Sequence, residues 1–130
     1  MRFELQHVKY MPKELLPGIL YVSRAFETAA HLCACGCGSK IRTPLGPTEW
    51  SVEETAGGPT VRPSIGNWQK PCRSHYVIRR GEVRWGKQWS DDQVLAGRRA
   101  EERRRAAYFS QREKQRRPTF WAWLVGLFRR

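Results

Sequence analysis

The chain has few acidic residues and no long apolar run, and each shortage excludes a class of protein. Asp and Glu number 12 against 24 Lys and Arg in 130 residues, which gives a net charge of +12 at pH 7. No apolar run reaches the ~18 residues that a membrane-spanning helix needs. The first ten residues carry charges and lack the apolar segment of a signal peptide. We therefore predict a cytoplasmic protein whose partner is nucleic acid, an anionic membrane surface or an acidic protein face.

The positive charge is concentrated in one short segment. Residues 97–117 hold nine basic and three acidic side chains, half of the total excess. Most Gly and Pro precede this segment, which is itself free of proline and rich in helix-forming Ala, Arg, Glu and Gln. The predicted parts are a β-rich domain in residues 1–89, a basic helix in residues 90–117 that ends at Pro118, and an aromatic amphipathic tail in residues 118–130.

Short β-rich pieces separated by Gly and Pro indicate a small β domain. Arg80-Gly81 separates two of these pieces and predicts a tight hairpin. The predicted strands are Ile19–Ser23, Ser39–Thr43, Thr60–Pro63, His75–Arg79 and Glu82–Trp85.

All four cysteines fall in two clusters, His31–Gly38 (HLCACGCG) and Pro71–His75 (PCRSH). Two short groups of ligands on separate turns can converge on one tetrahedral metal ion, and clustered thiolates repel one another unless a cation holds them. The candidate ligands are Cys33, Cys35, Cys37, Cys72 and His75, one more than a tetrahedral ion needs. The preferred set is Cys35, Cys37, Cys72 and His75, with Cys33 as a close substitute.

Three cysteines and one histidine favour Zn²⁺ in a structural site, and an iron–sulfur cluster is the alternative. Cys72-x-x-His75 resembles the second loop of Rieske domains, but the first cluster offers no Cys-x-His, so zinc is preferred. The predicted fold is a small, mainly-β zinc-binding domain, Rieske-like or zinc-ribbon-like, followed by a basic α-helix and a short aromatic tail.

Motifs for catalysis are scarce. The sequence has no phosphate-binding glycine loop and no recognisable serine-based motif. A free Cys33 with His31 two residues away is the only nucleophile that the motifs offer. We therefore predict a binding module without catalytic residues.

The C-terminal part offers two candidate binding surfaces. An anionic partner such as nucleic acid would contact Arg98, Arg99, Arg103, Arg104, Arg105, Arg112, Arg116 and Arg117. A partner's groove, the body of the protein or, less favoured, a membrane interface would cover Phe120, Trp121, Trp123, Leu124, Leu127 and Phe128.

The two cysteine clusters and a third motif together resemble a small bacterial family of unknown function. The motifs are HLCACGCG, Pro63–Trp68 (PSIGNW) and PCRSHY, and the resemblance covers about residues 11–86 but not the chain from Lys87 onward. The family is a cytoplasmic Cys/His metal domain whose genes often lie beside those of ubiquitin-like conjugation systems.

This resemblance implies a non-catalytic zinc-binding accessory or adaptor protein of a bacterial ubiquitin-like conjugation system. Its partner would be a larger protein, such as an E1-like, E2-like or ubiquitin-like protein. The alternatives are a nucleic-acid-binding zinc protein that uses the Arg-rich helix and an iron–sulfur redox or sensing protein.

Overall fold

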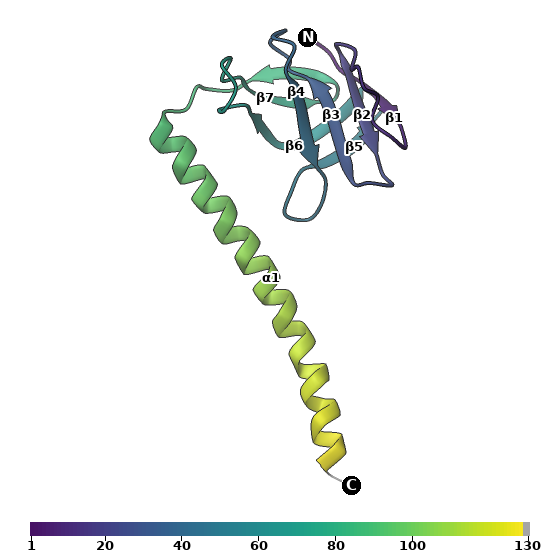
Figure 1. The fold of residues 1–130 in the computed structure, drawn as a ribbon, viewed down its shortest axis with the longest axis vertical. Helices are drawn as coiled ribbons and strands as arrows, with labels where there is room; N and C mark the ends of the chain where they lie inside the picture. Colours follow the sequence, from purple (N-terminus) through teal and green to yellow (C-terminus); the bar gives the residue numbers. More distant parts are fainter. Residues whose placement is uncertain (129–130) are drawn as a thin grey trace. The chain divides into compact units, whose positions relative to one another are not determined.

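A computed structural model describes residues 1–128, and the side chains of residues 1–115. The chain forms two compact units, one in Met1–Trp89 and one that begins at Ser90. The prediction of a mainly-β domain followed by a helix is confirmed (Figure 1). The strands are β1 (Glu4–His7), β2 (Ile19–Ser23), β3 (Thr28–Leu32), β4 (Lys40–Pro44), β5 (Ser51–Thr55), β6 (Gly58–Gly66), β7 (His75–Arg79) and β8 (Glu82–Trp85).

The strands form two four-stranded sheets, ordered β1-β2-β3-β4 and β5-β6-β7-β8. Within each sheet, strands that follow one another in the chain lie side by side. Every neighbouring pair is antiparallel except β1 and β2, which are parallel. The hairpin predicted at Arg80-Gly81 is confirmed, since Arg79 pairs with Glu82 across a two-residue turn. Both turn residues have positive φ (51° and 82°), as a tight hairpin of this length requires.

One buried cluster of apolar side chains joins the two sheets. The N-terminal segment connects them further, because Phe3 N–H donates to Gly81 O at 2.6 Å and Glu4 N–H donates to Gly18 O at 2.8 Å. The cluster consists of Phe3, Leu20, Val22, Ala29, Cys33, Ala34, Ile41, Val52, Val61, Ile65, Tyr76 and Ile78.

The second unit is formed by a single helix, α1 (Asp91–Phe128). Its start is capped, because Ser90 Oγ accepts from Gln93 N–H at 3.2 Å while Gln93 Oε1 accepts from Ser90 N–H at 2.8 Å. The predicted end at Pro118 is wrong. A proline inside a helix removes one backbone hydrogen bond, and the helix continues past this loss to Phe128.

Within the described part of the chain, no helix combines the length and the apolar character that crossing a membrane requires.

Phe3 is fully buried where the N-terminal segment meets both sheets. We expect Phe3→Ala to lower the free energy of unfolding by about 3–5 kcal/mol, because it removes a buried ring and leaves a cavity. Phe26→Ala is the matched control, since Phe26 is 56% exposed, and should change it by less than about 0.5 kcal/mol. Urea unfolding measures both values, and equal effects would contradict the described core.

Candidate functional site

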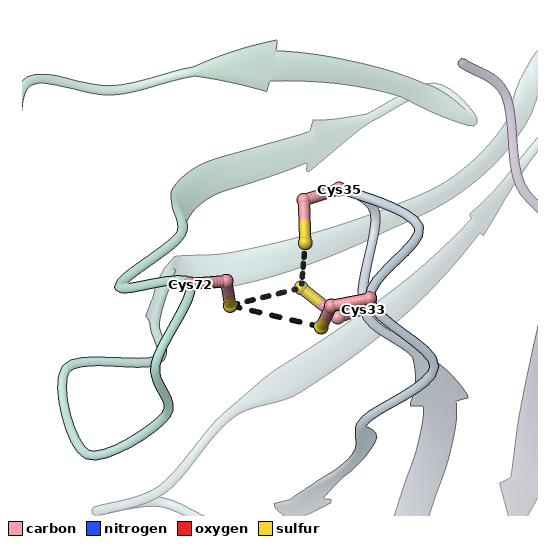
Figure 2. Close-up of side chains that lie close together, drawn as sticks. Cys33, Cys35 and Cys72 are labelled. Carbon is pink, nitrogen blue, oxygen red and sulfur yellow. Dashed lines mark hydrogen bonds between the residues drawn. The ribbon is translucent and has the colours of Figure 1, made fainter.

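The structure brings the four cysteine sulfurs together from two separate loops. Cys33, Cys35 and Cys37 lie in the turn between β3 and β4, and Cys72 lies in the loop between β6 and β7. Figure 2 shows Cys72 facing the turn that carries Cys33 and Cys35. The Sγ–Sγ distances are 3.5 Å for Cys33–Cys35, 3.9 Å for Cys33–Cys72 and 3.7 Å for Cys37–Cys72. All four sulfurs lie within 4.8 Å of one another.

These distances suit one tetrahedral ion. Zn–S bonds of about 2.3 Å place the sulfurs of a tetrahedral site ~3.8 Å apart. The ligands also have outer partners, because Asn67 Nδ2 donates to Cys33 Sγ at 3.5 Å and Ser74 Oγ donates to Cys72 Sγ at 3.3 Å. The four cysteines could therefore hold one metal ion.

The environment of each thiol differs. Hydrogen bonds from the Ser39 hydroxyl and backbone lower the pKa of Cys37 to about 6. Burial raises the pKa of Cys33 to about 11. Burial also opposes ionisation of Cys72, yet hydrogen bonds from the Ser74 hydroxyl and backbone lower its pKa overall. Because a bound cation favours the thiolate form, Cys37 is prepared as a ligand whereas Cys33 needs the metal in order to lose its proton.

His75 lies in a different arrangement from the one predicted. Its Nε2 is 3.0 Å from Ser64 Oγ, and its Nδ1 is 2.7 Å from the backbone oxygen of Lys87. Both ring nitrogens therefore have partners outside the cysteine cluster. The group of possible metal ligands that the structure brings together consists of the four cysteines. It contains Cys33 and not His75, which the preferred ligand set included.

The pairing of β6 with β7 explains how Ser64 reaches His75. Gly66 pairs with His75, and Ser64 lies two residues before Gly66, where the register between the two strands shifts. On the other side, Gly86 N–H donates to His75 O at 2.7 Å. A Cβ on Gly86 would lie 2.7 Å from His75 Nδ1. The absence of a side chain there lets the imidazole extend to the carbonyl of Lys87.

Two tryptophans pack beside the imidazole. The ring centroids of Trp68 and Trp89 lie 5.0 and 5.1 Å from that of His75, and the two indoles stack on each other at 5.4 Å and 15°. Arg73 supports the pair, since its guanidinium donates to Trp89 O at 3.1 Å and lies over the Trp68 ring. These contacts restrict the orientation of His75.

The arrangement has the three parts of an activated nucleophile. Ser64 supplies a hydroxyl, His75 supplies a base in contact with it, and the carbonyl of Lys87 orients the base through the other ring nitrogen. The sequence interpretation missed this pair, because His75 also stands at metal-ligand spacing from Cys72. The available signal was that Ser64 and His75 lie in two of the motifs that carry the family resemblance.

The other predicted residues lie outside this site. His31 is fully buried, and Nε2 lies 2.6 Å from Tyr76 Oη. Burial lowers the pKa of His31 to about 4, so it is a neutral core residue.

The arginines of α1 are exposed at 98, 99, 103, 104 and 112, whereas Arg105 is half-buried. The side chains of Arg116, Arg117, Phe120, Trp121, Trp123, Leu124, Leu127 and Phe128 lie outside the described residues.

A family model described as "Bacterial ubiquitination-like system serine protease (BubE)" matches residues 7–86. The matched segment contains the four cysteines, Ser64 and His75. No curated protein and no solved structure matches the chain. A Rieske-like or zinc-ribbon-like fold therefore stays a prediction.

The two ligand sets give different expectations for metal content. We expect Cys33→Ser to lower the metal content of the purified protein severalfold, because it removes one of four converging sulfurs. We expect His75→Gln to leave it at the wild-type value, since both ring nitrogens of His75 have other partners. Elemental analysis by mass spectrometry measures the content. Loss of metal in His75→Gln alone would support the set with histidine.

In metal-free protein, iodoacetamide should modify Cys37 well before Cys33. Above pH ~6 the Cys37 thiol is mostly ionised, whereas burial keeps Cys33 protonated. The rate at Cys37 should therefore fall as the pH drops through about 6. Peptide mapping over a pH series measures it. Ser39→Ala removes the hydroxyl donor and should move this midpoint upward, and an unchanged midpoint would contradict the assigned cause.

Proposed function

Because the chain belongs to the BubE family, we propose that it is a serine protease of a bacterial ubiquitination-like system, with Ser64 as nucleophile and His75 as general base. Family membership links the chain to that system, as the sequence predicted. The observation that carries the catalytic proposal is the 3.0 Å contact between Ser64 Oγ and His75 Nε2. It favours a protease over the non-catalytic adaptor that the sequence predicts.

The proposed reaction begins with attack of Ser64 Oγ on the carbonyl carbon of the scissile bond. His75 Nε2 accepts the hydroxyl proton as the new C–O bond forms, and then gives that proton to the leaving amine as the C–N bond breaks. Water then attacks the acyl–Ser64 ester with His75 again as base, which releases the carboxylate product and restores the hydroxyl.

The carbonyl of Lys87 takes the position that a carboxylate holds in a Ser-His-Asp triad. At 2.7 Å it accepts a hydrogen bond from Nδ1–H, which leaves Nε2 free to accept one from Ser64. The same hydrogen bond strengthens when His75 becomes positively charged. A neutral carbonyl stabilises an imidazolium less than a carboxylate does, so we expect the turnover to depend strongly on geometry.

For the cysteine cluster, we propose a structural Zn²⁺. Sγ–Sγ distances of 3.5–3.9 Å support a single ion over an iron–sulfur cluster, whose iron and sulfide atoms would hold the ligands farther apart. Four thiolates close the coordination shell and leave no open position for substrate. When bound, the ion would hold the two loops together, and the reaction would be carried out by Ser64 and His75.

The substrate class that suits this family is a peptide or isopeptide bond to a ubiquitin-like protein. E1-like, E2-like and ubiquitin-like proteins of the same pathway are the proposed partners, and a cytoplasmic location stays part of the proposal. Binding of nucleic acid by the arginines of α1 is the competing partner prediction, and a steep loss of affinity with salt would identify it.

We expect Ser64→Ala and His75→Gln each to lower hydrolysis of a fusion to the system's ubiquitin-like protein by about 10³-fold or more, since they remove the nucleophile and its base. Ser51→Ala is the matched control, because Ser51 is exposed at the start of β5, and should retain wild-type activity. Gel analysis of timed digests measures the rates.

A fluorophosphonate probe offers a second measurement that needs no substrate. It should modify Ser64 in the wild-type protein and not in Ser64→Ala, with the modified peptide identified by mass spectrometry. Wild-type protein that neither cleaves the fusion nor reacts with the probe, yet still binds an E1-like or E2-like partner, would instead support the adaptor hypothesis.

A further inference from the structure

The loop between β6 and β7 carries parts of both the cysteine cluster and the Ser–His pair. Ser64 lies near the end of β6, His75 begins β7, and residues 67–74 connect them. The loop closes on itself, because Asn67 N–H donates to Ser74 O at 2.7 Å and Arg73 N–H donates to Lys70 O at 3.0 Å. Its conformation therefore determines where β6 presents the nucleophile and where β7 presents the base.

Asn67 connects this loop to the cysteine cluster through its side chain. It is only 8% exposed, and its Nδ2 donates to Cys33 Sγ at 3.5 Å. Tyr76, the residue after His75, lies close to the same sulfur, because the N–H of Ala34, which follows Cys33, donates to its hydroxyl at 3.5 Å. Cys33 and Tyr76 are both core residues with at most 1% exposure. The amide of Asn67 thus joins the loop to a cluster sulfur, and the residue after that sulfur contacts the strand that carries His75.

A second connection runs through Cys72. Its sulfur lies 3.9 Å from Cys33 and accepts from Ser74 Oγ at 3.3 Å, and Ser74 directly precedes His75. The two ends of the loop are thus both held against the cluster, Asn67 by its amide and Ser74 by its hydroxyl. A cation bound by both sulfurs would hold Cys72 against Cys33, and without it only the Sγ–Sγ contact and the hydrogen bonds from Asn67 and Ser74 would hold the two ends.

We propose that Asn67 is a positioning residue that couples the cysteine cluster to the Ser64–His75 pair, so that metal occupancy of the cluster controls the reactivity of Ser64. The inference rests on the proposed function and deepens it, because it assigns the metal a regulatory role in the same site. Loss of the metal would switch off the hydrolase while Ser64 and His75 themselves remain intact.

Asn67→Ala and Gln69→Ala form the matched pair that tests the coupling in the full chain. Gln69 is exposed in the same loop. When compared at equal Zn²⁺ content, Asn67→Ala should react with a fluorophosphonate probe about tenfold to 100-fold more slowly than the wild-type protein, because the base is displaced from the nucleophile. Gln69→Ala should match the wild-type rate. Asn67→Asp is of equal size but lacks the N–H donor, so it should react as slowly as Asn67→Ala. If the alanine variant does not fold, the aspartate variant tests the coupling in its place.

A spectroscopic signal separates positioning from a general loss of structure. In the wild-type protein, the proton on His75 Nδ1 that is shared with Lys87 O should give a downfield NMR resonance, and His75→Gln assigns it. That resonance should broaden or disappear in Asn67→Ala and after the metal is removed with a chelator, and return when Zn²⁺ is added.

The outcomes distinguish this inference from the proposed function. If Ser64 reacts equally fast in wild-type, Asn67→Ala and metal-free protein, the coupling is wrong while the Ser–His pair stands. If Ser64 of the metal-loaded wild-type protein does not react, the proposed function fails and the inference fails with it. Slowed reaction and loss of the resonance in both Asn67 variants, with metal retained, would support the coupling.

Discussion

The convergence of four cysteine sulfurs is the constraint on which the rest of the first unit depends. Three of the sulfurs come from the turn that joins two strands of one sheet, and Cys72 comes from the loop that joins two strands of the other. A cation among them would therefore connect the two sheets at one end. A unit of this size buries a limited core, so a connection between the sheets adds stability where apolar packing alone gives little.

The convergence of the sulfurs also separates the thiol of Cys72 from the imidazole of His75, although the two residues lie close together in the sequence. Cys72 lies in the loop, whereas His75 begins a strand and pairs with Gly66. The thiol faces the cluster and the imidazole faces Ser64, so residues three apart serve different sites. Four thiolates would leave a metal no open position, so in the proposed function the sulfurs hold the ion and the imidazole transfers the proton.

Features set by neighbouring residues could be predicted from the sequence, whereas features set by strand register could not. The strands β2, β7 and β8 and the hairpin at Arg80-Gly81 follow local patterns, as does the gathering of the cysteines. The strand β3 was missed, because it is buried on both faces and rich in alanine, without alternation. The contact between His75 and Ser64 was missed, since it exists only once β6 and β7 are paired.

The carbonyl of Lys87 makes the geometry of the Ser–His pair decisive. A carboxylate would stabilise a protonated imidazole by its charge over a range of positions, but a carbonyl acts as a short-range dipole. The surroundings of His75 accordingly leave it little freedom. Gly86 makes room for the ring and two stacked indoles limit its rotation. Ser74, the residue before His75, donates a hydrogen bond to the sulfur of Cys72. A site built on a neutral orienting group would require this rigidity, and the cysteine cluster contributes to it through Ser74, next to the indoles that contact the ring directly.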